Sequence, residues 1–114
     1  MTTGPSDSAL IVLTSLPSRE AAMQLARALV ERRLAACVNL LAECSSIYRW
    51  QGAVETAQEV PLLIKTRETL YEAVEATIRE LHPYELPEIL AVTVQRGLPG
   101  YPEWLVSETA APSR

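Results

Sequence analysis

Two segments of this sequence carry apolar residues at helical spacing, and strand-like segments precede and follow each of them. The helical segments span residues 18–33 and 67–82, where apolar side chains recur three and four positions apart. The repeating positions are Ala22, Leu25, Ala26 and Leu29 in the first segment, and Leu70, Val74, Thr77, Ile78 and Leu81 in the second. Each helix therefore has one apolar face that must be buried against another layer of the structure.

The remaining apolar segments are typical of strands. Residues 9–13 form a short β-branched run, and residues 35–50 show no helical stripe but alternate with period two near their end. After Gln51–Gly52, which predicts a tight turn, residues 54–66 continue as the second strand of a hairpin. Pro61 cannot donate a hydrogen bond, so it predicts a bulge or an outward-facing position in that strand. A last strand begins near residue 88.

The order of elements is therefore βαββαβ, which predicts an α+β fold of the ferredoxin-like type, with two helices on one side of a four-stranded antiparallel sheet. We expect one domain over residues 9–106. Residues 1–8 and 107–114 lack a periodic apolar pattern and are predicted to be flexible tails. Deletion of residues 1–7 is accordingly expected to leave the melting temperature nearly unchanged.

The predicted central hairpin is too long for so small a sheet, because strands usually span only about 3–10 residues. Its far end carries Tyr48 and Trp50, whose aromatic rings favour buried contacts. Exposed strand edges of this kind are commonly covered by closed symmetric assembly. The sequence therefore indicates a homo-oligomer.

Composition and charge exclude several classes of function. The chain has 114 residues, 48% of them hydrophobic and 21% charged, and a net charge of -4 without a basic stripe, so nucleic-acid binding is not expected. The N-terminal segment resembles neither a secretion signal nor a membrane span, which makes the cytoplasm the expected location. Cys37 and Cys44 are expected to be reduced thiols, because they lie too far apart along an extended segment to form a disulfide.

The segment LHPYELPEI, residues 81–89, holds the only histidine of the chain together with two prolines, a tyrosine and two glutamates. Pro83 and Pro87 restrict the residues before them, so the segment is predicted to be a rigid connector between the second helix and the last strand. Glu85 and Glu88 are expected to face opposite sides of this extended connector.

Four blocks, RRLAACVN, SIYRWQG, EVPLLIKT and LHPYELPEI, resemble the CutA divalent-cation-tolerance family over about residues 9–106. The resemblance implies a ferredoxin-like trimer, similar to the nitrogen-regulatory signal transducers, with long hairpins packed between subunits. It also implies a link to copper and other divalent cations, although no reaction is established for the family.

The resemblance further implies two possible sets of metal ligands. The copper site proposed in bacterial relatives falls on Thr14, Leu81 and His82 of this sequence, and only His82 is a suitable ligand. A second set falls on Cys37 and Glu59. The chain has no closely spaced Cys or His pair, so any Cu²⁺ or other divalent cation is expected to bind weakly through His82, Cys37 and Glu59.

Each candidate residue also has a structural interpretation. Cys37 in an apolar strand is typical of a small buried hydrophobe, and His82 of a helix C-terminal group. The aromatic pair in the hairpin is typical of interface packing. Lys65 is either a solvated strand end or a cation at an intersubunit pocket. The predicted intersubunit cleft consists of Tyr48, Trp50, Lys65, His82, Tyr84, Glu85 and Glu88.

The sequence favours binding over catalysis, because the single histidine has no serine or cysteine partner placed by sequence. We therefore predict a non-enzymatic, trimeric, metal-responsive binding or signalling protein, with no nucleic-acid or membrane partner. Two alternatives remain open: a small-molecule enzyme that uses the intersubunit cleft, and a scaffold that anchors another protein.

Overall fold

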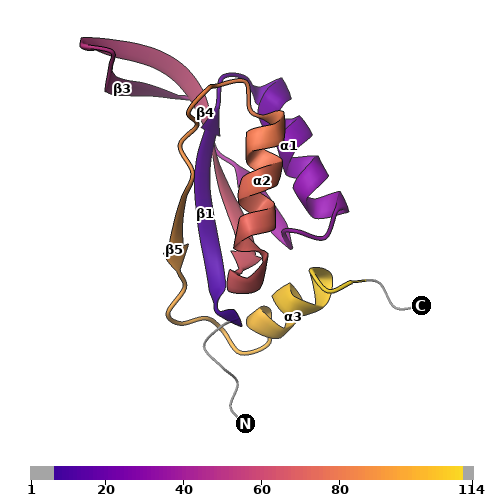
Figure 1. Cartoon of the computed structure of the whole chain (residues 1–114). Coiled ribbons are helices and arrows are strands. Elements are labelled where there is room, and N and C mark those ends of the chain that lie inside the picture. Colours follow the sequence, from indigo (N-terminus) through magenta and orange to yellow (C-terminus); the bar gives the residue numbers. More distant parts are fainter. Residues whose placement is uncertain (1–6, 112–114) are drawn as a thin grey trace.

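A computed structural model describes residues 7–111 of the chain. Its helices and strands follow the predicted order, with an additional helix at the C-terminal end (Figure 1). The elements are β1 (Ala9–Leu16), α1 (Arg19–Glu31), β2 (Cys37–Leu40), β3 (Cys44–Trp50), β4 (Ala53–Arg67), the short 3₁₀ helix η2 (Glu68–Leu70), α2 (Tyr71–Leu81), β5 (Leu90–Thr93) and α3 (Tyr101–Glu108). Within these residues, no helix is both long and apolar enough to cross a membrane.

The sheet is antiparallel, with strand order β2-β4-β1-β5, and α1 and α2 pack on one of its faces (Figure 1). This arrangement confirms the predicted α+β fold with an antiparallel sheet. Alternate residues of β1 and β4 point into the layer between sheet and helices, where Val12, Leu16, Leu62 and Ile64 are fully buried or nearly so. The predicted helix faces supply the other side of this core through residues such as Leu25 and Ile78.

The first helix begins where the sequence predicts it. Ser18 has extended backbone angles and its hydroxyl accepts a hydrogen bond from the Ala21 amide at 3.1 Å, so it caps the N-terminus of α1. The negative charge of Glu20 in the first turn suits the positive end of the helix dipole. Local sequence signals therefore determine this boundary without help from tertiary contacts.

Strand β4 pairs with three other strands along its length. Its first half, from Ala53 to Glu59, pairs with β3, and its second half pairs with β1 and β2. The β3–β4 hairpin turns at Gln51–Gly52, where both residues have positive φ, as a type I′ turn requires. The hairpin extends away from the sheet and gives the molecule a long dimension of 51 Å (Figure 1).

The single strand predicted over residues 35–50 is wrong in one respect, because residues 41–43 interrupt it and divide it into β2 and β3. The interruption lies opposite Pro61, whose carbonyl accepts a hydrogen bond from the Leu41 amide at 2.9 Å. Between the Leu40–Leu62 and Cys44–Glu59 pairs, three residues of one strand face two of the other, which is a bulge. The bulge thus lies at Pro61, which has no amide proton to donate, and it is one of the two outcomes that the sequence predicted for this residue.

Among residues 7–111, no helix or strand covers the face of the sheet opposite α1 and α2 (Figure 1). Leu13 lies opposite Leu63 on one side and Leu90 on the other, so these three side chains share this face with Ile11 and Val92. Leu90 and Val92 are 58% and 51% exposed. An apolar sheet face with no covering layer is typical of a protein interaction surface.

The predicted tail boundaries are wrong on both sides for the residues that the structure describes. Arg67, at the end of β4, donates hydrogen bonds to the Asp7 carboxylate at 2.6 Å and to both the hydroxyl and the carbonyl oxygen of Thr109. Thr109 is buried and α3 extends to Glu108, past the predicted end of the domain at residue 106. The predicted tail segments 1–6 and 112–114 lie outside the described residues.

Candidate functional site

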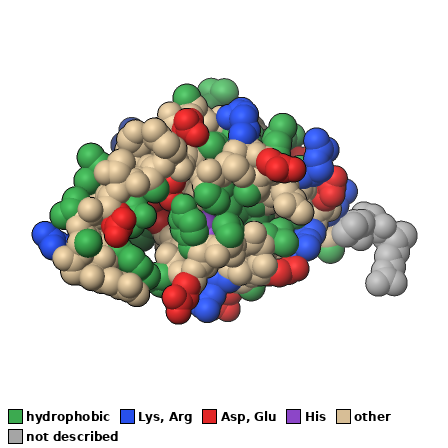
Figure 2. Space-filling view, turned by 90° about the horizontal axis from the view of Figure 1, so that it is seen from above, with side chains coloured by type: hydrophobic (Ala, Val, Ile, Leu, Met, Phe, Trp, Pro, Cys, Tyr) green, Lys and Arg blue, Asp and Glu red, His purple; other side chains and the backbone are tan. Residues whose placement is uncertain are grey.

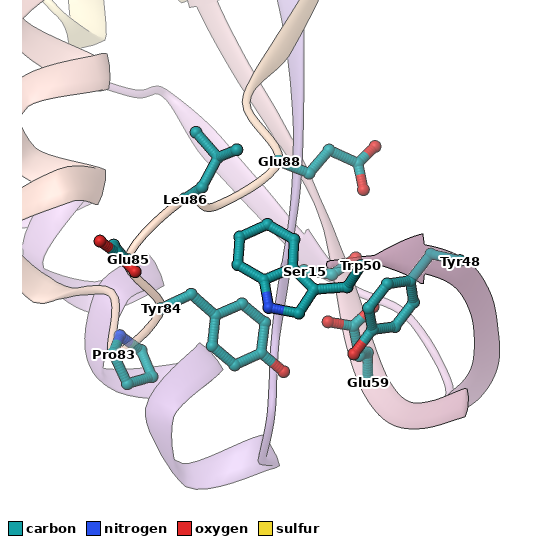
Figure 3. Close-up of a pocket in the computed structure, with 9 residues that line it drawn as sticks. All are labelled: Ser15, Tyr48, Trp50, Glu59, Pro83, Tyr84, Glu85, Leu86 and Glu88. Atoms are coloured by element: carbon teal, nitrogen blue, oxygen red, sulfur yellow. The ribbon is translucent and has the colours of Figure 1, made fainter. Parts of the chain in front are cut away.

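A cavity of about 540 Å³ lies where the base of the β3–β4 hairpin meets the connector between α2 and β5 (Figure 3). The hairpin, the end of β1 and the connector each contribute part of its wall. The lining residues are Ser15, Tyr48, Trp50, Glu59, Pro83, Tyr84, Glu85, Leu86 and Glu88. We call this cavity the hairpin cleft. Figure 2 shows the molecule from the hairpin end, with hydrophobic side chains gathered near the centre of the view and charged side chains around them.

The aromatic residues of the hairpin reach the cleft because β3 alternates its side chains between two faces. Tyr48 and Trp50 are two residues apart and therefore lie on the same face, which is also the face of Glu59 because Glu59 pairs with Cys44. Glu59 is only 9% exposed. Both parts of the hairpin thus turn side chains toward the connector.

Tyr84 links the connector to the hairpin. Burial raises the pKa of the Tyr84 hydroxyl above its usual value, and the negative charge of Glu59, together with a hydrogen bond to that carboxylate, raises the pKa further. The neutral phenol is therefore the form that donates to Glu59. This contact holds an aromatic ring and a buried carboxylate side by side in the cleft.

His82 lies behind the hairpin cleft and does not line it within one chain, so its place in an intersubunit cleft stays a prediction. The side chain is 7% exposed, and its Nε2 lies 2.6 Å from the carbonyl oxygen of Ser15. Since a carbonyl oxygen only accepts, Nε2 is the donor, and Nδ1 accepts from the Tyr84 amide at 3.1 Å. Both ring nitrogens are engaged, and the ring also packs on Tyr84 with centroids 4.8 Å apart.

Lys65 and Cys37 are remote from the cleft lining. They lie opposite each other in the β2–β4 pair, and the Lys65 ammonium donates a hydrogen bond to the side-chain oxygen of Asn39. Lys65 therefore does not line the hairpin cleft of one chain; it lies opposite Ile11 on the open face of the sheet, and its place in an intersubunit cleft stays a prediction. Cys37 is partly buried and Cys44 is exposed, and both are free thiols, as expected.

The described residues do not fit a copper site within one chain. No group of three His, Cys, Asp or Glu side chains comes together among residues 7–111. Cys37 and Glu59 pair with different residues, Lys65 and Cys44, and the nitrogens of His82 are already hydrogen-bonded. Thr14, at another position that the family resemblance implicates, is buried in the core with no hydrogen-bond partner for its hydroxyl within the described part of the chain.

Five of the predicted cleft residues do line the cleft, namely Tyr48, Trp50, Tyr84, Glu85 and Glu88, and the predicted metal ligand Glu59 joins them. Glu85 and Glu88 both line the cavity, and their carboxylates point in opposite directions, as expected for this connector (Figure 3). Sequence reasoning missed Ser15, Pro83 and Leu86. The exposed position of Leu86 between two prolines, 72% exposed in the structure, is a signal that could have been used.

Comparison with known proteins places this geometry in a family. A family model described as CutA1 divalent ion tolerance protein matches residues 10–108. The chain belongs to the CutA1 divalent ion tolerance family. CutA1 membership accounts for the four sequence blocks, three of which meet at or beside the hairpin cleft.

Individual CutA relatives agree with this assignment. The chain is 46% identical over 99 residues to the divalent-cation tolerance protein CutA of Thermus thermophilus, covering 87% of this chain and 96% of that protein. It is 43% identical over 97 residues to mouse protein CutA, covering 85% of this chain but only 55% of the mouse protein. The chain thus spans about half the length of the mouse relative and nearly all of the bacterial one.

Solved CutA structures show the same fold. The Thermus thermophilus divalent cation tolerance protein superposes with a TM-score of 0.87 at 44% identity, covering 90% of this chain and 99% of that one. CutA1 from Oryza sativa gives a TM-score of 0.89 at 35% identity, covering 96% and 100%. Relatives described as chloroplastic, from rice, and as periplasmic, from Archaeoglobus fulgidus, show that CutA1 membership does not determine the compartment. The cytoplasmic location stays a prediction.

Proposed function

We propose that this chain acts in divalent-cation tolerance as a non-enzymatic homotrimer that responds to a ligand bound in the hairpin cleft. Two surfaces support assembly: the open apolar face of the sheet and the hairpin that extends beyond it. Ser15 and Glu59 lie on the same side of the sheet as Leu13 and Leu63, by the alternation of β1 and β4. The cleft therefore borders the face that a second copy would cover.

The observation that carries the proposal is the buried carboxylate of Glu59. It lies in the cleft without a Lys or Arg partner, since the ion pairs found within residues 7–111 join Arg32 with Glu80 and Arg67 with Asp7. A buried carboxylate without a counter-charge is energetically unfavourable, and a bound cation removes that penalty. The cleft is thus suited to a positively charged ligand.

Copper is expected to bind only weakly. Cu²⁺ prefers imidazole and thiolate, whereas the cleft offers carboxylates and phenols, and the chain does not bring its cysteines and histidine together. Glu59 is the ligand that we assign to divalent cations, with His82 as the structural support of the cleft wall. Cys37 has no role in this proposal.

A catalytic role is less well supported by the same geometry. The only histidine of the chain is not free to act as a general base, because Nε2 donates to Ser15 and Nδ1 accepts from Tyr84. The hydroxyl groups of the cleft, on Ser15, Tyr48 and Tyr84, therefore have no imidazole to activate them.

Isothermal titration of the purified protein with Cu²⁺, Zn²⁺ and Mg²⁺ tests the proposal. We expect weak binding that is lost in Glu59→Gln and retained in Cys37→Ser. Glu108→Gln, which removes the same charge from the exposed end of α3, is the matched control and should bind like the parent protein. Tight Cu²⁺ binding that survives Glu59→Gln, or no divalent-cation binding at all, would overturn the assignment of Glu59 as the divalent-cation ligand.

A further inference from the structure

The hairpin cleft has aromatic walls that a metal ion would not use. Figure 3 shows Tyr48 and Trp50 from β3 and Tyr84 from the connector around one space, with Glu59 entering it from β4. The three aromatic side chains are 43%, 40% and 37% exposed, so much of their ring surface is open to a ligand. From these walls and from the charge of the cleft, we propose that its ligand is a small organic cation, a quaternary ammonium or a protonated amine.

The charges in the cleft select for a cation. Among the described residues, its lining includes three glutamates, Glu59, Glu85 and Glu88, of which only Glu59 is buried, and no Lys, Arg or His. Glu59 is the least exposed of them, and the Tyr84 hydroxyl donates a hydrogen bond to its carboxylate. The attraction of a positive group to this position is strengthened by the low exposure of Glu59.

The aromatic rings distinguish an organic cation from a divalent metal ion. The faces of Trp and Tyr attract an ammonium group through their quadrupole, and this attraction is stronger when water is excluded. A divalent metal ion instead needs several oxygen, nitrogen or sulfur ligands close together, and among the described residues no three acidic, Cys or His side chains are grouped closely enough to hold one. An alkylammonium satisfies both the rings and the single buried carboxylate.

The size of the cleft fits the same class of ligand. Its volume of about 540 Å³ is within the range of small-molecule sites, and exposed Leu86 adds an apolar surface at its edge. The inference rests on the proposed function in one respect, since it takes the hairpin cleft to be the ligand site. It adds the chemical class of the ligand.

Choline and its neutral carbon isostere, 3,3-dimethyl-1-butanol, form a matched pair of probes that differ in charge and not in shape. The chain has two tryptophans, so the test uses the full chain carrying Trp104→Phe, in which Trp50 is the only tryptophan and reports from the cleft. We expect choline to change the Trp50 emission in a saturable manner. The isostere should bind at least about ten-fold more weakly.

Two variants then test the two parts of the cleft by calorimetry. Glu59→Gln and Trp50→Leu should each weaken choline binding by about ten-fold, whereas Glu108→Gln should leave it unchanged. Circular dichroism of each variant verifies that the fold is retained. Equal binding of choline and the isostere, or choline binding that is independent of Glu59, would overturn the inference, as would a cleft that binds neither probe because a second copy fills it.

The outcome separates this inference from the proposed function. Divalent cations that bind in a Glu59-dependent manner, without any choline binding, would contradict the organic cation and support the proposed metal response. Choline binding that depends on Glu59 and Trp50, without any divalent-cation binding, would support the inference and contradict the direct metal contact.

Discussion

His82 does not line the hairpin cleft, but its hydrogen bonds hold the connector that forms one wall of the cleft against β1. One ring nitrogen binds the carbonyl of Ser15 at the end of β1, 67 residues away, and the other binds the amide of Tyr84, so a single side chain joins β1 to the connector. The proline that follows His82 excludes the helical conformation there, which lets the ring turn inward. A residue that looked like a metal ligand in the sequence is thus part of the framework.

His82→Ala is expected to lower the free energy of unfolding by about 2–3 kcal/mol, because it leaves the Ser15 carbonyl and the Tyr84 amide without their partner. Denaturant unfolding at fixed protein concentration measures the change. Glu85→Gln, an exposed change in the same connector, should alter stability by less than about 0.5 kcal/mol. If both variants unfold alike, His82 does not support the cleft.

Asp7, the only aspartate of the chain, contributes stability that depends on pH. Burial raises its pKa, but hydrogen bonds from Arg67 and Thr69 and the charge of Arg67 outweigh this, so the pKa is below its usual value of 3.8. The stabilisation is therefore present above pH 3.8 and is lost as the pH falls through the lowered pKa.

Asp7→Asn should accordingly destabilise the protein by about 0.5–1 kcal/mol at neutral pH, a modest effect because the Asp7 side chain is 36% exposed to solvent. Thermal unfolding as a function of pH should show the two proteins converging below about pH 3. Glu43→Gln, a change at an exposed position, serves as the control. A difference between parent and Asp7→Asn that persists at pH 2 would rule out the ion pair as its cause.

At the scale of elements, the hairpin turn is the most sharply defined local structure. Gln51 has φ of 50° and Gly52 has φ of 84°, both in the left-handed region. Glycine adopts this region at no steric cost, whereas glutamine does so with difficulty. The turn therefore fits Gly52 well and Gln51 poorly.

Two substitutions in this turn are therefore expected to change the free energy of unfolding in opposite directions. Gln51→Asn should raise the free energy of unfolding by about 0.5–1 kcal/mol, because Asn-Gly is the preferred pair for this turn. Gly52→Ala should lower it by about 1 kcal/mol through backbone strain alone, because a methyl group there would contact nothing within 4 Å. Denaturant melts of both variants measure the effects, and two changes of the same sign would be inconsistent with this turn.

Much of the arrangement of elements could be predicted because local signals agree with the global fold. The apolar periodicity of both helices, the cap at Ser18 and the turn at Gln51–Gly52 are each determined by nearby residues. The bulge at Pro61 followed from the missing amide proton, although its position opposite residues 41–43 needed the register.

The site was less predictable, because its members meet through tertiary contacts. The sequence placed Tyr84 and Glu88 together on one connector, but nothing in the spacing told which side of β1 would face His82. Lys65 lies on the same face of β4 as Glu59. It is six residues further along the strand, however, beside Asn39 and away from the cleft. The hydrogen bonds of Arg67 to Asp7 and Thr109 were not predicted, because only the complete fold brings these three residues together.

At the scale of the whole molecule, we expect copies to associate through the open face of the sheet. Leu90→Glu introduces a charge on this face, in the edge strand β5, while leaving the core between sheet and helices intact. We expect the parent protein to have three times the 12.5 kDa mass of the chain by light scattering, and the variant to dissociate toward monomer.

Leu98→Glu is the matched control, because Leu98 is 78% exposed but lies in the segment after β5, outside the sheet. The control should retain the mass of the parent protein. A parent protein that scatters as a monomer at micromolar concentration would refute the trimer, and a trimer unaffected by Leu90→Glu would assign the interface to another surface.

The hydrogen bonds of Arg67 bring Asp7 and Thr109 to one guanidinium, at the end of β4 that is remote from the hairpin (Figure 1). Both described ends of the chain are therefore anchored at a common point, with the length of the sheet between that point and the cleft. Any protein joined before Asp7 or after Thr109 would leave the cleft accessible. In a three-fold assembly, an attached domain or surface tether would display three clefts at once without obstructing them.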